Sequence, residues 1–196
     1  MNFYFLLFDK FETLDLFGPV EIFGRIPDAR LDYISMKGGI ITSAQDTQIL
    51  TQKAAKLADN AVLVIPGGRG TRPLVKDADF LARLKDLADS AANVLSICTG
   101  SAFLAAAGVL VNVKATSNKN AFEWVTSTGM QSGSEKHVGF MMAVFTRHRE
   151  FQRELTWHWD SLPIITAWML LKPMHKRPNI FGMKIQKLIR LLKVLK

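Results

Sequence analysis

Ala61–Ile65 is an unbroken run of apolar residues, AVLVI, that leads into a Pro-Gly-Gly turn. A strand with one face in water alternates apolar and polar residues, so a continuous run predicts a strand covered on both faces. Apolar patterning predicts further buried strands at 2–8, 31–36 and 94–97, and helices at 13–24 and 77–91. Strands that alternate with helices favour an α/β fold, a doubly wound, mostly parallel sheet in three α/β/α layers.

Weaker signals fill the remaining part of the first 130 residues. Residues 40–57 predict short strands or a hairpin, 113–116 a short strand, and 119–126 a helix. Several polar or glycine residues directly follow the predicted strands: Asp15, Gly67, Gly68, Cys98, Ser117 and Asn118. Because sites in such sheets lie at the carboxyl ends of the strands, we expect these residues to converge.

Cys98 is the single cysteine of the chain, and it stands between a predicted strand and an Ala-rich helix. A residue at such an elbow projects from the sheet and faces the unpaired N–H groups of the helix, which favour a thiolate. The alternative is a small buried hydrophobic residue, which is the usual role of an isolated cysteine. The position at the elbow favours the nucleophile.

Three further groups have chemistry that suits a thiolate attacking an electrophilic carbon. Asp15 is a candidate acid–base carboxylate, although it also suits a helix terminus. Gly67 and Gly68 are candidate oxyanion-binding residues because glycine lets the backbone approach a substrate, although a Pro-Gly-Gly turn alone is weak support. Thr99 either donates its hydroxyl to the substrate or completes the turn.

These segments resemble the ThiJ/PfpI superfamily, with class I glutamine-amidotransferase-like, flavodoxin-like folds. The motifs that carry the resemblance are LLFD at 6–9 with TLDLFGPVE at 13–21, IPGGRGTR at 65–72 and ICTGS at 97–101, within residues 1–133. The branch they resemble is the isonitrile-hydratase-like one. The resemblance implies that Cys98 is the nucleophile, Asp15 the acid–base carboxylate and Thr99 a supporting hydroxyl, with Gly67, Gly68, Thr99 and Asn118 around the substrate.

The reaction that this resemblance implies is addition of water to an isocyanide, a small-molecule substrate, to give an N-substituted formamide. It implies no metal, no organic cofactor and, for intact relatives, a homodimer. No histidine directly follows Cys98, which argues against a peptidase. Two alternatives remain open: a non-catalytic domain of the same fold that senses a small molecule, and a relative with glyoxalase-like or stress-response chemistry.

The chain changes character near residue 135. Residues 1–136 contain 14 basic and 14 acidic side chains, whereas residues 137–196 contain 11 and 3, which is the whole net charge of +8. We therefore divide the chain into an incomplete ThiJ/PfpI-like domain at 1–135 and an atypical basic C-terminal tail at 136–196. Because the family's closing segments are not recognisable in that tail, we expect the sheet to lack its last strands.

We interpret the tail as the product of a one-base frame shift near codons 133–136. In the frame that starts at the third base of each codon, Met141-Met142-Ala143 encodes Asp-Gly, and 157–160 encodes Ala-Leu-Gly. Residues 145–156 permit Tyr-Thr-Ser-Ser-Gly in the same frame, as expected for the family. The basic amphipathic stretch 184–196 is therefore read as incidental and not as a membrane-binding helix.

The nucleotide sequence of codons 125–196 tests this interpretation directly. We expect the alternative frame to be open and to encode Asp-Gly followed by Tyr-Thr-Ser-Ser-Gly, because a selected frame keeps a family pattern that an unselected one loses. A stop codon in that frame, or the absence of either segment, contradicts the frame shift.

Composition limits the cellular compartment and the kinds of partner that we expect for this protein. One cysteine rules out an internal disulfide and fits a reducing compartment. The apolar start is too short for a signal peptide, and no stretch reaches the ~20 apolar residues of a membrane span. We expect a cytoplasmic protein with no nucleic-acid or membrane partner, because the first 136 residues carry no net charge.

Overall fold

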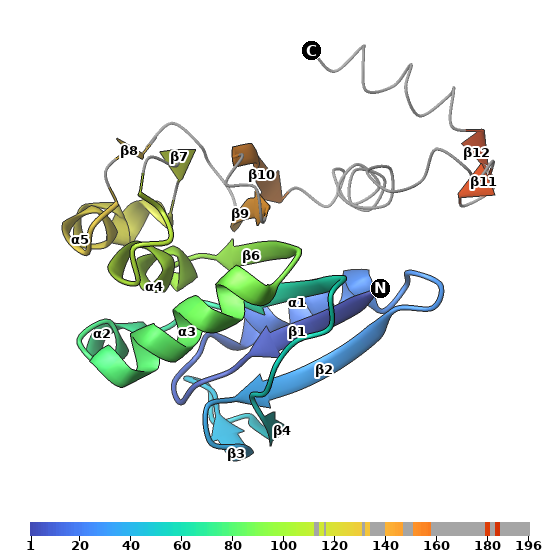
Figure 1. Cartoon of the computed structure of the whole chain (residues 1–196), viewed down its shortest axis with the longest axis horizontal. Coiled ribbons are helices and arrows are strands. Elements are labelled where there is room, and N and C mark those ends of the chain that lie inside the picture. The colour runs from blue at the N-terminus through green and yellow to red at the C-terminus, as the bar shows by residue number, and fades with distance from the viewer. Residues whose placement is uncertain are drawn as a thin grey trace. The chain divides into compact units, whose positions relative to one another are not determined.

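The computed structural model describes residues 1–111, 114–115, 117–130, 132–133, 140–146, 151–157, 179–180 and 183–184 (Figure 1). The chain divides into two compact units, Met1–Trp157 and His158–Lys196. In the second unit the described residues form two short antiparallel strands, β11 (Asn179–Ile180) and β12 (Met183–Lys184). The stretch 184–196 otherwise lies outside the described residues.

One large sheet organises the described part of the first unit. Its strands run in the order β10-β9-β6-β5-β1-β2-β4-β3. Their bounds are β1 Asn2–Leu6, β2 Arg30–Ser35, β3 Gly39–Thr42, β4 Gln48–Lys53, β5 Ala61–Ile65, β6 Asn93–Ile97, β9 Phe140–Thr146 and β10 Phe151–Trp157. The five strands from β6 to β4 pair in parallel, and the outer strands pair antiparallel. The predicted mostly parallel α/β sheet is confirmed.

The centre of the sheet is buried on both sides, as the apolar run predicted. All five residues of β5 are buried. On β1, Phe3 and Phe5 lie against Phe23, and the Phe3 and Phe23 rings stack at 4.4 Å between centroids. Aromatic side chains bury large apolar areas, so the packing of these three rings contributes strongly to the stability of the core.

Helices cover the two faces of the sheet, with α1 behind it and α3 in front of it in Figure 1. Their bounds are α1 Thr13–Phe23, α2 Thr71–Leu74, α3 Ala78–Ser90, α4 Gly100–Ala106 and α5 Phe122–Ser127, with a 3₁₀ turn, η1, at Lys119–Ala121. The N-cap of α3 is Asp77, which accepts a hydrogen bond from the backbone N–H of Phe80. Phe80 then packs against Phe103 of α4.

The ambiguous segment 40–57 contains a hairpin, as one of the two predicted possibilities. Strands β3 and β4 pair antiparallel, with Ile40 opposite Leu50, and β4 also extends the sheet by pairing with β2. The strand predicted at 113–116 is shorter: β7 (Lys114–Ala115) pairs with β8 (Ser132–Gly133) outside the large sheet.

The edge of the sheet beside β6 differs from the sequence-based expectation of missing strands. β9 pairs antiparallel with β6, from Asn93 opposite Thr146 to Ile97 opposite Met142, and β10 pairs with β9. The sequence of β9, FMMAVFT, is apolar enough to form a strand, and the pairing occupies the edge hydrogen-bonding groups of β6. The domain boundary at residue 135 and the frame shift remain predictions.

Within the described ranges, no helix is both long and apolar enough to cross a membrane.

Candidate active site

Cys98 occupies the bend between β6 and α4, two residues before the helix begins. Its backbone φ is +53°, a left-handed conformation that non-glycine residues seldom adopt. Two hydroxyl groups hold the carbonyl of this residue: Ser101 Oγ donates to it at 3.3 Å and Ser117 Oγ at 3.1 Å. The bend is therefore fixed from both the helix and a distant loop, and the thiol is half-buried at the carboxyl edge of the sheet.

Asp15 faces this bend from the first turn of α1. Its side chain is 1% exposed, and its Oδ2 accepts a hydrogen bond from the backbone N–H of Gly67 at 2.9 Å. The carbonyl of Gly67 in turn accepts from the N–H of Glu12 at 2.9 Å, which closes a small ring between α1 and the loop after β5. Cys98 lies against the same glycine, since a Cβ atom at Gly67 would be 2.9 Å from the Cys98 Cβ, and the charge of Asp15 acts on the Cys98 thiol. The structure thus brings the two predicted reactive groups together.

The close approach of Thr99 requires a glycine at position 67, and the backbone conformation requires a glycine at position 68. A Cβ atom at Gly67 would lie 2.6 Å from the backbone nitrogen of Thr99, and Gly68 has a φ of +130°. The Gly67 N–H donates to Asp15, and the Gly68 N–H donates to Thr99 Oγ1 at 3.0 Å. Both predicted oxyanion donors therefore have protein acceptors in this state, and their role toward a substrate remains a prediction.

Thr99 ties the bend to the loop after β5. Besides accepting from Gly68, its Oγ1 lies 3.4 Å from Thr71 Oγ1, which itself donates to the Gly68 carbonyl at 2.7 Å. Thr71 is fully buried. The sequence analysis did not single it out, although it belongs to the IPGGRGTR motif, and its hydroxyl orients the turn that contacts Asp15.

Asn118 completes the surroundings of the sulfur. Its Oδ1 accepts from the backbone N–H of Asn120 at 2.9 Å, and its Nδ2 donates to Cys98 Sγ at 3.3 Å. Because the oxygen is engaged at the start of η1, the amide nitrogen is the atom directed at the sulfur. Asn118 was predicted near the substrate, and its amide nitrogen lies within hydrogen-bond distance of the Cys98 sulfur.

The electrostatics of the pair differ from the expectation of a stabilised thiolate. Burial, opposed by the Gly67 N–H and assisted by the charge of Glu12, raises the pKa of Asp15 from 3.8 to about 7. Burial and the charge of Asp15 raise the pKa of Cys98 to about 11, although Asn118 and Thr99 donate hydrogen bonds that lower it. Burial is the largest of these influences, so removal of the thiol from water outweighs the hydrogen bonds that favour its anion.

A cavity of about 680 Å³ has Phe8, Lys10, Arg69 and Phe80 among its lining residues. Neither Cys98 nor Asp15 is among its lining residues, so we define the site by its hydrogen-bond geometry and not by this cavity. In the described part of the chain, no group of three or more His, Cys, Asp or Glu side chains is arranged to hold a metal ion.

Comparison with known proteins shows which family and which sequences this chain matches. The sequence profile of the DJ-1/PfpI family matches residues 1–146. An isonitrile hydratase from Pseudomonas putida is 34% identical over 117 residues, which cover 58% of this chain and half of that protein. A protein of Streptomyces lividans, described as uncharacterised, is 33% identical over 118 residues, which cover 58% of this chain and 84% of that one.

Solved structures show the same fold at lower identity. A ThiJ/PfpI family protein from Pseudomonas syringae superposes with a TM-score of 0.68 at 21% identity, covering 99% of this chain and 84% of that chain. DJ-1beta from Drosophila melanogaster superposes with a TM-score of 0.61 at 15% identity, covering 99% and 96%. An AraC family transcriptional regulator from P. putida gives 0.54 at 17% identity, covering 68% and 75%.

Proposed function

Because this chain belongs to the DJ-1/PfpI family, we propose that it is a cysteine-nucleophile enzyme that adds water to an isocyanide and forms an N-substituted formamide. The observation that carries the proposal is that Asp15 and Cys98 both lie against Gly67, with the Gly67 N–H bonded to the carboxylate and the Asn118 amide bonded to the sulfur. The similarity to an isonitrile hydratase over half of its length supports the choice of substrate class.

The first step joins the sulfur to the terminal carbon of the isocyanide. Asp15, whose pKa of about 7 leaves much of it ionised at neutral pH, takes the thiol proton as the S–C bond forms. It then delivers that proton to the same carbon, which gives a thioimidate, R–N=CH–S–Cys98. Asp15 thus moves one proton from sulfur to carbon, and its raised pKa suits both halves of the transfer.

The raised pKa of Cys98 does not prevent this step. Part of the rise comes from the negative charge of Asp15, and that charge disappears when the proton moves to the carboxylate. Proton transfer within the pair therefore meets less resistance than loss of the proton to water. The Asn118 amide and the Thr99 backbone and hydroxyl groups, which favour the sulfur anion, assist the transfer.

The second step hydrolyses the thioimidate. Asp15 accepts a proton from water as the oxygen attacks the C=N carbon and delivers it to the nitrogen, which gives R–NH–CH(OH)–S–Cys98. As this intermediate collapses, Asp15 takes the hydroxyl proton and passes it to the sulfur, the C–S bond breaks and the formamide R–NH–CHO leaves. The Asn118 N–H, which lies 3.3 Å from the sulfur, stabilises the departing thiolate.

One observation favours a second candidate, a sensing domain that binds a small molecule without turnover. A thiol with a pKa of about 11 is almost entirely protonated at neutral pH, as expected for a residue with no nucleophilic role. The solved AraC family transcriptional regulator has a similar fold, and this similarity shows the fold alone.

A product assay separates these candidates. The purified chain is incubated with a simple alkyl isocyanide or with methylglyoxal, and formamide or lactate is measured by NMR. We expect formamide with the isocyanide. Lactate alone indicates glyoxalase-like chemistry, and saturable binding of a small molecule with neither product supports the sensing domain.

A further inference from the structure

We propose that Gln45, in the turn between β3 and β4, is a positioning residue that fixes the start of helix α1 and thereby holds Asp15 against Cys98. This inference rests on the proposed function of that pair. Gln45 is thirty positions from Asp15 in sequence, on a different element, and no catalytic motif includes it.

Gln45 supplies the N-terminal cap that α1 does not make for itself. Glu12, the N-cap residue, forms no capping hydrogen bond with its side chain. Instead Gln45 Oε1 accepts from the backbone N–H of Thr13 at 3.0 Å and from the Thr13 hydroxyl at 2.6 Å. The first backbone N–H groups of a helix have no partner within the helix, so this oxygen satisfies a donor that otherwise needs water.

The amide nitrogen of Gln45 makes the complementary contact. Its Nε2 donates to Glu12 Oε1 at 2.7 Å, so the one amide contacts two successive residues at the start of the helix. Glu12 is also the carboxylate whose charge raises the pKa of Asp15. Gln45 therefore fixes both the backbone position of α1 and the position of the nearest negative charge.

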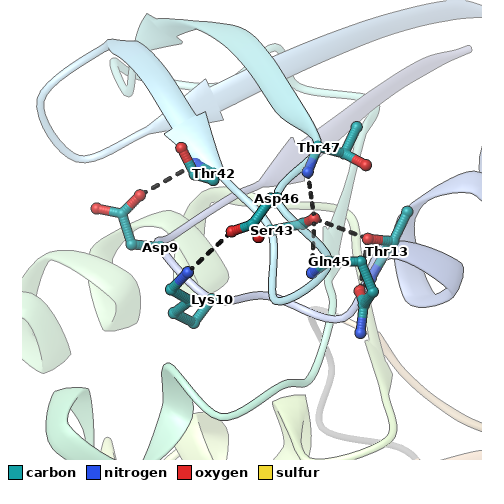
Figure 2. A network of polar contacts seen from close by, with 8 residues as sticks. All are labelled: Asp9, Lys10, Thr13, Thr42, Ser43, Gln45, Asp46 and Thr47. Carbon is teal, nitrogen blue, oxygen red and sulfur yellow. Dashed lines mark hydrogen bonds and ion pairs between the residues drawn. The ribbon is translucent and has the colours of Figure 1, made fainter.

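The turn that presents Gln45 is rigid. Ser43 is fully buried, and its Oγ accepts from the backbone N–H groups of Gln45 and Thr47 at 3.2 and 3.0 Å and lies 2.8 Å from the Thr13 hydroxyl (Figure 2). An ion pair between Lys10 and Asp46 joins the same turn to the loop before α1. The side chain of Gln45 thus starts from a backbone that four contacts hold in place.

The loop before α1 connects this turn to the reactive pair. On one side, the Lys10 N–H donates to the Thr42 carbonyl at 2.7 Å. The Phe11 carbonyl accepts from the Ala44 N–H, also at 2.7 Å. On the other side the N–H of Glu12 bonds Gly67, whose own N–H bonds Asp15. Three hydrogen bonds therefore connect Gln45 to Asp15: Gln45 to Glu12, Glu12 to Gly67, and Gly67 to Asp15.

The test uses four variants and a reaction that requires no isocyanide. The rate of alkylation of Cys98 by iodoacetamide is measured from pH 5 to pH 10, where titration of Asp15 gives an inflection near pH 7. The groups that influence this inflection are Glu12 at the start of α1, Cys98 at the bend and the Gly67 N–H. Because the chain has one cysteine, the label reports that residue alone.

We expect Gln45→Ala to move the inflection upward by at least about 0.5 pH unit, because the Gly67 hydrogen bond to Asp15 loosens. Gln45→Glu moves it upward as well, since a second carboxylate then faces Glu12. The double variant Glu12→Gln/Gln45→Glu exchanges donor and acceptor, keeps the contact and returns the inflection to the wild-type value or below. Gln48→Ala, an exposed glutamine in β4, is the matched control and leaves it unchanged.

Turnover gives a second readout. We expect kcat for isocyanide hydration to fall by about 10- to 100-fold in Gln45→Ala, with recovery in the double variant. An inflection in Gln45→Ala equal to that of Gln48→Ala overturns the inference, as does a folded double variant that does not recover. If the inflections move as expected while no variant forms formamide, Gln45 positions Asp15 and the proposed reaction is wrong.

Discussion

Replacing Cys98 with alanine is expected to reduce isocyanide hydration by about 10⁴-fold or more, because no other group described here can form the thioimidate. The conservative change Cys98→Ser is expected to be almost as severe, since a buried hydroxyl beside a carboxylate is a far weaker nucleophile than a thiol. Formamide release from saturating isocyanide, measured by NMR, gives the rates.

Mass spectrometry of the intact chain provides the positive evidence for the same prediction. Acid quenching during turnover is expected to trap wild-type protein heavier by the mass of one isocyanide, and neither variant is expected to show this adduct. Ser127→Ala is the control for loss of a small polar side chain, because the Ser127 hydroxyl bonds the Trp124 carbonyl within α5. If Cys98→Ala keeps a tenth of wild-type activity, Cys98 is not the nucleophile.

Asp15→Asn is expected to lower kcat/KM by about 10²- to 10⁴-fold, the usual range for removal of a general acid–base group. The amide oxygen still accepts from the Gly67 N–H, so the loss reflects proton transfer and not position. The same change removes the charge that raises the pKa of Cys98, so iodoacetamide is expected to alkylate the thiol at lower pH than in the wild type. Reactivity of the thiol and turnover thus move in opposite directions.

The stability of Asp15→Asn is expected to depend on pH in a specific way. Because the pKa of Asp15 rises from 3.8 to about 7 on folding, its contribution to stability is fully present below pH 3.8 and is lost as the pH rises through 7. Asparagine does not ionise, so the free energy of unfolding of the variant is expected to match the wild type near pH 3.5. It exceeds the wild type by roughly 4 kcal/mol above pH 8.

Chemical denaturation at pH 3.5, 6 and 8.5 measures this difference. Asp86→Asn, which changes an exposed aspartate of α3, is the control for loss of a surface carboxylate. A constant difference between wild type and Asp15→Asn at all three pH values contradicts the raised pKa. Full activity in Asp15→Asn contradicts its acid–base role independently of that result.

Much of the fold could be predicted because its strongest signals are local. The apolar run of β5, the helical spacing in α3 and the turn after each strand all depend on neighbouring residues. The edge beside β6 was harder to predict, because pairing of β9 depends on which strand remains available and not on a motif in β9 itself. The resemblance seen in the sequence motifs covers residues 1–133 and gave no help there, although the family match extends to residue 146.

The site shows the same division between local and distant information. Asp15, Gly67 and Cys98 follow β1, β5 and β6, which are neighbours in the large sheet, so the topology brings these three to one edge. Asn118 follows β7, which lies outside that sheet, and reaches Cys98 through its side-chain amide. The contacts of Gln45 cross 32 and 33 positions of sequence, and no local pattern marks a side chain that caps a distant helix. The pKa of Cys98 was predicted in the wrong direction because sequence reveals the helix terminus but not the depth of burial.

The left-handed backbone at Cys98 limits which side chains this position accepts. Glycine, asparagine and aspartate tolerate a φ of +53° best, whereas a branched Cβ as in threonine or valine crowds the neighbouring carbonyl groups. A saturation library at position 98, sorted by solubility, should therefore be rich in small and unbranched residues and poor in threonine. Directed evolution toward a hydroxyl nucleophile in this scaffold would have to proceed through serine.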